Sequence, residues 1–204
     1  MVSYVIIFPA AAYMLGSIPF GKLIAKKAAS IDITTQGSRN IGATNVARVV
    51  GVKWGIITLI LDMLKGLVPV LLFSFIAPDG TPHREIGLAG IGLCALLGHQ
   101  FPLFLRFRGG KGVATALGVY LAISPFSCFA ILLIFLLVVF IWDMVSLGSM
   151  ISMSALPVVL FLFGESQAVV VGSIIMAAFI CFKHRENIQR LVKGGERKWS
   201  DRGR

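Results

Sequence analysis

The sequence predicts an all-α integral membrane protein with seven transmembrane helices, an external N-terminus and a cytoplasmic C-terminus. Composition is the first observation, because 57% of the 204 residues are hydrophobic and only 14% are charged, whereas soluble domains carry about a quarter charged residues. Length is the second: at roughly 20 residues per span, the chain has room for about six to eight helices. The third is the position of the basic residues, which sets the orientation.

The 19 lysines and arginines are strongly clustered. All but Lys65 and Arg84 lie in or beside residues 22–53, 106–111 and 183–204. Segments rich in lysine and arginine stay in the cytoplasm, so we expect these three on the cytoplasmic side. The net charge of +10 therefore reflects membrane topology. No nucleic-acid partner is expected, because the sequence contains no soluble domain with groove-reading elements.

The first span is expected at residues 2–24. Pro9 and Pro19 interrupt it, which membrane helices tolerate better than soluble ones do. No basic region precedes this apolar stretch, and its small alanines lie inside it. A cleaved signal peptide is therefore not expected.

The second span, residues 54–77, contains two charged residues. Asp62 and Lys65 are three positions apart and so share one helix face. Charges this deep in a span face the protein interior and pair with one another. A structural ion pair is the favoured interpretation, and a catalytic role stays open. Residues 78–84 form a short external loop.

The third span, residues 85–101, is rich in glycine and alanine, which allow close helix contact. His99 at its end is interpreted as a capping or core residue. The later apolar run is too long for one crossing. It predicts a short pair of helices, residues 113–127 and 128–142, hinged near Ser124.

The sixth span has its core at residues 150–163, after a polar break at residues 143–149. The seventh, residues 168–182, leads directly into a basic tail. The three cysteines are odd in number and lack metal-ligand spacing, so we expect buried thiols within the bilayer. They are Cys94, Cys128 and Cys181.

Residues 1–204 are expected to form a single transmembrane domain, since neither a repeat nor a soluble segment is evident. With seven spans, the polar segments 37–48, 98–118 and 183–196 all lie on the cytoplasmic face. An even number of spans would separate them.

The segment at residues 98–118 predicts a phosphate cradle. Glycine lets backbone N–H groups approach a ligand, arginine suits paired phosphate oxygens, and lysine supplies a point charge. An anchor loop that obeys the positive-inside rule is the competing interpretation. The cradle residues are Arg106, Arg108, Gly109, Gly110, Lys111 and Gly112.

Two other segments carry similar chemistry. Residues 37–48 combine small hydrogen-bonding side chains with two arginines, more than an ordinary turn requires. Residues 183–196 follow directly after the last span. If they remain helical, His184 and Asn187 share a face, although a solvated membrane-surface helix is equally compatible. The polar side chains of the first segment are Ser38, Asn40, Thr44, Asn45 and Arg48.

Several other chemistries are excluded by the pattern. Lys111 is not part of a Walker loop, because Gly112 follows it where Ser or Thr belongs. No His-x-x-x-x-Asp pair occurs, and no Gly-x-Ser-x-Gly elbow. No acidic cluster is available to hold magnesium. No metal or cofactor is therefore expected.

Three motifs, taken together, carry a resemblance to a known family. They read Gly37-Ser-Arg-Asn-Ile-Gly-Ala-Thr-Asn-Val-Ala-Arg48, Gly98-His-Gln-Phe-Pro followed by Arg108-Gly-Gly-Lys-Gly112, and Lys183-His-Arg-Glu-Asn-Ile-Gln-Arg190. In this order they resemble the motifs of the bacterial PlsY-type acyl-phosphate:glycerol-3-phosphate acyltransferases. Residues 62–66 and 146–149 also resemble segments of that family. Arg39 departs from its pattern, in which glycine is expected.

The resemblance implies transfer of a fatty acyl group from acyl phosphate to glycerol 3-phosphate. The products would be 1-acylglycerol 3-phosphate (lysophosphatidic acid) and inorganic phosphate, in phospholipid biosynthesis. Neither acyl-CoA nor a metal would be used. The protein would lie in the bacterial cytoplasmic (inner) membrane among its lipids, with its site facing the cytoplasm. An upstream acyl-phosphate synthase would supply the donor.

The resemblance also assigns site residues. The catalytic set comprises Ser38, Arg48, Lys111, His184 and Asn187. The substrate-binding set comprises Asn40, Thr44, Asn45, Gly110, Gly112 and Ser149. His184 is expected to be neutral, because its basic neighbours should lower its pKa. Donation of one hydrogen bond to the substrate is favoured for it, and general-base catalysis stays open.

Two other classes of function remain to be weighed. A transporter for a phosphate ester would use a similar basic pocket, but it should show a site on broken helices near the midplane and inverted halves. A lipid-binding scaffold would not require the serine, asparagine, threonine and glycine set. Neither pattern is evident in the sequence.

Overall fold

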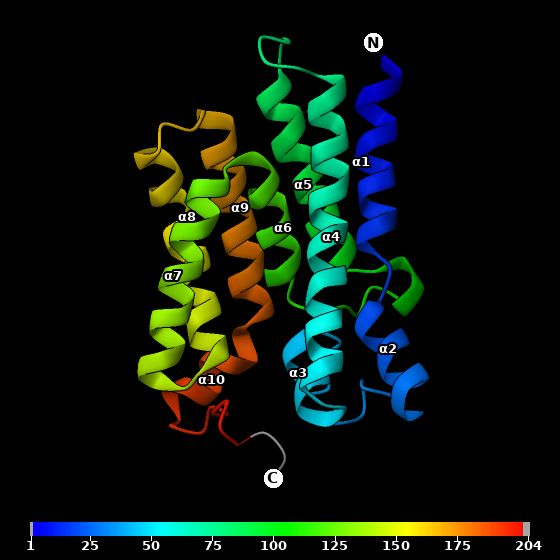
Figure 1. Ribbon diagram of the computed structural model, residues 1–204, viewed down its shortest axis with the longest axis vertical. Coiled ribbons are helices and arrows are strands. Elements are labelled where there is room, and N and C mark those ends of the chain that lie inside the picture. Colours follow the sequence, from blue (N-terminus) through cyan, green and yellow to red (C-terminus); the bar gives the residue numbers. More distant parts are fainter. Residues whose placement is uncertain (1, 202–204) are drawn as a thin grey trace.

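The computed structural model describes residues 2–201, with side chains from residue 7 onward. Within this range the chain is all-helical and contains no strand (Figure 1). The helices are α1 (Val2–Gly16), α2 (Phe20–Ala29), α3 (Ala43–Val49), α4 (Val52–Ile76), α5 (Arg84–Gln100), η1 (Leu103–Leu105), α6 (Val113–Ile123), α7 (Pro125–Trp142), α8 (Val145–Leu162), α9 (Gln167–Lys183) and α10 (Arg185–Val192). The all-α prediction is confirmed for this part of the chain.

Several helices have the length and hydropathy of membrane spans. Among the described residues, five stretches are long and apolar enough to cross a membrane, and six if the bent pair α9 and α10 counts as one span. Helix α6 is apolar but has only 11 residues, too few to cross a bilayer unaided. It lies centrally between α4 and α8 (Figure 1).

The first predicted span is broken. Helix α1 ends at Gly16 and α2 begins at Phe20, with Pro19 between them. Proline lacks an N–H group, so backbone acceptors near it need another partner. The Lys65 ammonium donates to the carbonyl oxygen of Ile18 at 3.1 Å and so stabilises the break.

The predicted ion pair in α4 is present. Lys65 Nζ lies 2.8 Å from Asp62 Oδ1, and both side chains are almost fully buried. His99 of α5 approaches the same oxygen, with its Nδ1 at 3.6 Å. The interpretation of His99 as a core residue holds, since it is 3% exposed. This cluster joins α4 to α5 and to the break after α1.

Glycine allows α6 to approach α4 very closely. A Cβ on Gly118 would overlap the carbonyl oxygen of Met63, and one on Gly66 would overlap that of Thr115. The main core lies beside this contact, with Tyr120 of α6 fully buried. Of the three cysteines, all unpaired, Cys128 is buried and the other two are partly exposed.

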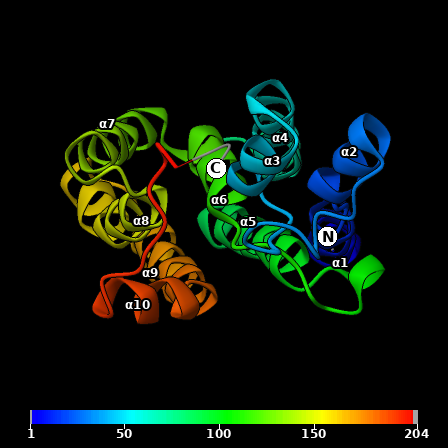
Figure 2. The same ribbon diagram turned by 90° about the horizontal axis from the view of Figure 1, so that it is seen from below.

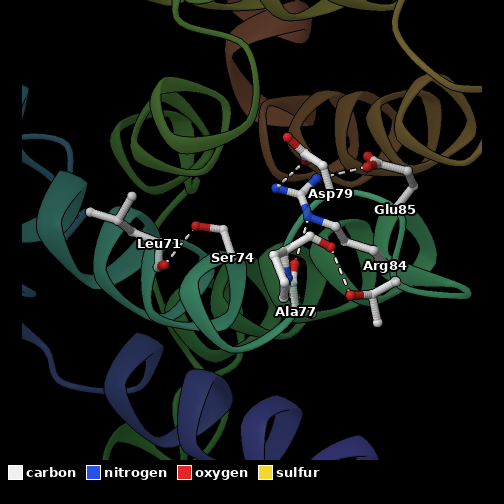
Figure 3. A network of polar contacts seen from close by, with 8 residues as sticks. Leu71, Ser74, Ala77, Asp79, Arg84 and Glu85 are labelled. Atoms are coloured by element: carbon white, nitrogen blue, oxygen red, sulfur yellow. Dashed lines mark hydrogen bonds and ion pairs between the residues drawn. The ribbon is translucent and has the colours of Figure 1, made fainter.

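The turn between α4 and α5 is fixed by one arginine. Arg84 Nε donates to the carbonyl oxygen of Ala77 at 2.7 Å, and its other nitrogens pair with Asp79 at 3.2 Å and Glu85 at 2.7 Å (Figure 3). This turn lies at the end of the bundle opposite α3 and α10 (Figure 1).

The second half of the chain departs from the predicted boundaries in three places. The break between α6 and α7 falls at Ser124, as expected, but α6 stops at Ile123. The polar break at residues 143–149 is mostly helical, because α8 already begins at Val145. The chain then bends by 61° between α9 and α10, so the tail does not continue the last span.

Polar segments far apart in the sequence meet at one end of the bundle. Helix α3 lies on one side and α10 on the other, and the chain after α10 crosses this end toward α7 (Figure 2). The Trp199 N–H donates to the carbonyl oxygen of Asp143 at 2.7 Å. The Ser200 hydroxyl donates to the Asp143 carboxylate. The crossing chain is thereby fixed to the end of α7.

Candidate active site

A cavity of about 560 Å³ opens at the polar end of the bundle. Residues from all three motif segments line it, together with residues from α4, α6, α7 and α8. It therefore brings together most of the site residues expected from the sequence. Those that line it are Ser38, Asn40, Thr44, Asn45, Arg48, Lys111, Gly112, Ser149, His184 and Asn187, whereas Gly110 does not.

Lys111 is held between two of the segments. Its ammonium donates to Asn187 Oδ1 at 2.5 Å, and its carbonyl oxygen accepts a hydrogen bond from Gln100 Nε2 at 2.8 Å. Burial lowers the pKa of Lys111 to about 8, and the opposing charge of Glu196 offsets part of that effect. The group is therefore mostly charged at neutral pH and can bind an anion.

The two cradle glycines have different structural tasks. Gly110 donates its N–H to the carbonyl oxygen of His99 at 3.1 Å and lies so close to the His99 ring that a Cβ would overlap Nε2. Gly112 has a φ of +87° and caps α6. Because α6 starts at the cavity wall, its free N–H groups and positive dipole end favour an anion there.

The cradle is smaller than the sequence indicated. Arg106 and Arg108 do not line the cavity. The reason lies in the backbone, since Arg106 and Phe107 both have left-handed φ values, of +50° and +63°. The chain therefore turns back on itself, and only Lys111 of the three basic residues reaches the cavity.

Asn45 organises the first motif. Its Oδ1 accepts the Ser38 N–H at 2.8 Å, and its Nδ2 donates to the carbonyl oxygens of Gln36 and Asn40 at 3.1 and 2.9 Å. The Asn40 side chain in turn accepts the Gly42 N–H at 2.8 Å. Asn45 and Asn40 thus shape this loop around their own backbone.

Ser38 and Arg48 remain available to a ligand. Both line the cavity, and within residues 2–201 neither side chain has a hydrogen bond or ion pair. Burial lowers the pKa of Arg48, and the nearby Arg197 acts in the same direction. The carboxylates of Glu196 and Asp201 offset part of this effect, but neither forms a direct ion pair with Arg48, and a partly buried guanidinium of this kind is a favourable site for a phosphate group.

His184 lies at the bend between α9 and α10 and is 2% exposed. Its Nδ1 is 2.8 Å from the carbonyl oxygen of Ile180. A carbonyl can only accept, so Nδ1 carries the hydrogen and the neutral ring offers Nε2 as an acceptor. The expected donation of a hydrogen bond to the substrate does not fit this tautomer.

The pKa of His184 is lowered to about 4. The direction agrees with the sequence prediction, but the cause differs. Burial contributes most, followed by the charge of Lys111 from the cradle. The basic neighbours of His184 in its own segment are not among the causes.

Glu196 is the most extensively hydrogen-bonded of the cavity residues that the sequence did not assign to the site. It lines the cavity and accepts hydrogen bonds from Ser146 Oγ at 2.8 Å and Asn187 Nδ2 at 2.7 Å, both on Oε1. Its Oε2 accepts from Arg190 Nε at 2.9 Å. The sequence offered one signal. Glu196 and Asp201 are the only acidic residues in the basic tail between Asn187 and the end of the described chain.

Ser149 belongs to the cavity wall rather than to its reactive centre. It is 5% exposed, and its hydroxyl donates to the carbonyl oxygen of Val145 in the preceding helical turn at 2.8 Å. A serine bonded to its own helix has less capacity left for a ligand.

The remainder of the cavity is apolar and leads sideways. Ile56 and Leu59 of α4 face Phe135 and Leu136 of α7 across it, with Leu117 of α6 also in the lining. Ile56, Leu59 and Leu136 are each more than 40% exposed. The apolar lining therefore reaches side chains that are exposed on the outer faces of α4 and α7.

The family model of glycerol-3-phosphate acyltransferase matches residues 6–194. The chain belongs to the glycerol-3-phosphate acyltransferase family.

Curated relatives agree with this assignment. A glycerol-3-phosphate acyltransferase of Geotalea daltonii is 51% identical over 185 residues, covering 91% of this chain and 92% of the relative. One from Desulfotalea psychrophila is 45% identical over 193 residues, covering 95% and 97%.

The fold is also that of a solved family member. The crystal structure of PlsY (YgiH), an integral membrane glycerol 3-phosphate acyltransferase, in its glycerol 3-phosphate form matches with a TM-score of 0.89 and 39% identity. It covers 95% of this chain and 94% of that one. The lysophosphatidic acid form of PlsY matches with a TM-score of 0.87.

The described residues of this family member contain no group of three or more potential metal ligands. The polar end of the cavity instead offers Lys111, Arg48, the Ser38 hydroxyl and the N-terminus of α6. The apolar end offers aliphatic and aromatic side chains. One cavity can therefore hold an anionic head and a long apolar chain side by side.

Proposed function

We propose that this protein transfers a fatty acyl group from acyl phosphate to glycerol 3-phosphate. The products are 1-acylglycerol 3-phosphate and inorganic phosphate, in phospholipid biosynthesis. The observation that carries the proposal is the continuity between a phosphate-binding polar end and a lateral apolar channel. Membership of the glycerol-3-phosphate acyltransferase family and the likeness to PlsY support the acceptor.

The two substrates bring two phosphate groups to one cavity. Lys111 and Arg48, with the Ser38 hydroxyl and the α6 N-terminus, bind phosphate oxygens and balance their charge. The acyl chain lies in the channel between α4 and α7. Asn187 positions the Lys111 ammonium through their hydrogen bond, and the first motif, shaped by Asn45 and Asn40, places Ser38.

The reaction needs little activation from the enzyme. The glycerol hydroxyl oxygen bonds to the acyl carbonyl carbon, the bond from that carbon to the phosphate oxygen breaks, and phosphate leaves with the hydroxyl proton. Acyl phosphate is a mixed anhydride, so its phosphate is a good leaving group. Holding the reactants together and stabilising the phosphate charge then supply most of the rate.

His184 orients the attacking hydroxyl. Its Nε2 accepts the hydroxyl hydrogen bond and points an oxygen lone pair at the acyl carbon. With a pKa near 4, the imidazole is a weak base, so the proton passes to the departing phosphate. No cofactor or metal takes part.

The topology proposed from the sequence accommodates this chemistry. Counting α1 with α2 as one span, α6 together with the chain at its two ends as one, and α4, α5, α7, α8 and α9 as one each gives seven crossings. An odd number separates the N-terminus from α10, and Figure 1 shows them at opposite ends. Residues 1–204 then form one acyltransferase domain of the bacterial inner membrane. The site faces the cytoplasm, where an acyl-phosphate synthase supplies the donor.

The test uses purified protein with palmitoyl phosphate and glycerol 3-phosphate. We expect lysophosphatidic acid and inorganic phosphate in equal amounts, each dependent on both substrates and on Lys111. EDTA should leave the rate unchanged. Product formation from palmitoyl-CoA but not from palmitoyl phosphate would refute the donor assignment, and phosphate release without glycerol 3-phosphate would indicate a hydrolase.

A further inference from the structure

The two arginines excluded from the catalytic cavity lie around another hollow. Lys22 of α2, Phe104 and Leu105 of η1, and Arg106 and Arg108 of the following turn line a space of about 460 Å³. We call this space the basic notch. It is built from two chain segments more than 80 residues apart, and none of its residues lines the catalytic cavity.

The backbone directs these arginines away from the catalytic cavity. The Phe107 N–H donates to the carbonyl oxygen of Pro102 at 2.9 Å, and Gly109 N–H returns to that of Gln100 at 3.2 Å. This closes a tight hairpin whose tip has consecutive left-handed residues without a glycine. Such a backbone is unfavourable and needs support from its surroundings.

Two of the three charges in the basic notch have no counter-ion in the described part of the chain. Within residues 2–201, the guanidinium groups of Arg106 and Arg108 have neither a hydrogen bond nor an ion pair. Lys22 pairs with Asp32 at 3.3 Å, with both side chains partly exposed. Two exposed guanidinium groups beside an ammonium provide bidentate donors for an anion such as phosphate.

The residues that line the basic notch include or adjoin exposed apolar residues in the chain, which we call the apolar collar. Leu23 of α2, Leu103 and Phe104 of η1, and Phe107 at the hairpin tip are each about half exposed. The hairpin projects from the outer edge of the bundle beside α1 and α2, in both views (Figures 1 and 2). Leu105, just before the arginines, ends a candidate membrane span.

We propose that the basic notch binds the headgroup of an anionic phospholipid from the surrounding bilayer. The arginines and Lys22 contact its phosphate, and the collar packs on its acyl chains. A soluble phosphate would gain nothing from four exposed apolar side chains, whereas basic pockets beside spans at the cytoplasmic boundary bind acidic lipid headgroups. The site is separate from the catalytic cavity and independent of the reaction.

The test uses the full-length protein, freed of lipid in a mild non-ionic detergent and titrated with phosphatidylglycerol or phosphatidylcholine. Native mass spectrometry measures the dissociation constant of each lipid. The wild type should bind one phosphatidylglycerol at least about tenfold more tightly than phosphatidylcholine. Substitution of Lys22, Arg106 and Arg108 together by glutamine should abolish that preference.

Matched variants separate charge, site and folding. Lys27→Gln, Lys53→Gln and Lys193→Gln together remove the same charge from exposed positions outside the basic notch and should keep the preference. Lys111→Ala should also keep it, which places the lipid outside the catalytic cavity. Asp32→Asn frees Lys22 and should tighten phosphatidylglycerol binding about threefold, a gain that a misfolded protein cannot show.

Three results would overturn the proposal. The first is equal binding of both lipids by the wild type. The second is undiminished preference in the triple glutamine variant, or no gain in Asp32→Asn. The third is displacement of phosphatidylglycerol by millimolar inorganic phosphate from wild type and Lys111→Ala alike, which would identify a site for free phosphate.

Discussion

Lys111 and Asn187 lie 76 positions apart in the chain, and the Lys111 ammonium donates to Asn187 Oδ1 at 2.5 Å. The same carboxamide donates through Nδ2 to Glu196. Asn187 thus accepts a hydrogen bond from Lys111 and donates one to Glu196, which fixes the Lys111 ammonium relative to α10 and the tail. The second and third motifs therefore act as one unit, and changes in either should impair the binding of phosphate.

Lys111→Ala should lower kcat/KM for glycerol 3-phosphate at least about a hundredfold, because a charged donor is lost at the phosphate. The variant should remain folded in detergent, since the side chain points into a cavity. Activity assays with a thermal unfolding control measure both. Lys193→Ala, at an exposed position, is the matched control. Near-native activity of Lys111→Ala would contradict the cradle assignment.

The pH profile should have an alkaline limb set by Lys111. Only the ammonium binds phosphate, and burial lowers its pKa to about 8, so kcat/KM should fall as the pH rises through that value. Bound phosphate favours the charged form, so the limb in kcat should lie at higher pH. Lys111→Arg should move the limb in kcat/KM beyond pH 10, because arginine stays protonated. An unchanged limb in this variant would assign it to another group.

Substitutions at His184 distinguish an orienting acceptor from a general base. Gln and Asn can still accept a hydrogen bond, so His184→Gln and His184→Asn should retain much more activity than His184→Ala. The wild type should show no limb from His184 near pH 6.5, since its pKa is about 4. If all three variants lose about a thousandfold in activity, and the acidic limb of the wild-type pH profile is absent from their residual activity, then His184 is the general base.

Gly110→Ala should raise the KM for glycerol 3-phosphate more than it lowers kcat. The new Cβ would overlap the His99 ring, and that ring is fixed between α4 and α5, so the cradle backbone must move. Steady-state kinetics with Gly195→Ala as control check this, because a Cβ on Gly195 meets nothing within 4 Å. Equal behaviour of the two variants would show that the cradle tolerates displacement.

Glu196→Ala should destabilise the protein by about 1–3 kcal/mol, since Ser146, Asn187 and Arg190 lose a common acceptor whose side chain is 4% exposed. It should also lower activity through Asn187. Glu186→Ala, an exposed acid on α10, should change stability by less than about 0.5 kcal/mol. Thermal unfolding and a double-mutant cycle with Arg190→Ala measure the coupling.

The sequence predicted the apolar helices well because a membrane span needs a continuous run of such residues. Residues 54–77 were expected and Val52–Ile76 was found. Helix α3 was missed, since seven mixed residues (Ala43–Val49) lack both length and apolar periodicity. The bend at His184 was missed because no proline or glycine marks it.

The candidate site was predicted in its residues but not in its arrangement. Ser38, Lys111 and His184 were assigned through the resemblance to the family motifs, and all three line one cavity, while their roles stay predictions. The separation of Arg106 from Lys111 depends on left-handed backbone at Arg106 and Phe107, which favours glycine and so has no sequence signal here. Glu196 acts only through tertiary contacts, so composition could not reveal its role.

In the topology proposed above, helix α6 lies between the substrate recess and the opposite side of the membrane. Its 11 residues extend about 16 Å, about half the thickness of the hydrocarbon core. The membrane potential therefore falls across a partition of half the usual thickness, and the electric field within it is correspondingly stronger. The close contact of Gly118 with Met63 and the complete burial of Tyr120 leave this partition tightly packed. In the proposed topology, we therefore expect residues that touch no substrate to keep the catalytic recess from becoming a leak for protons and ions.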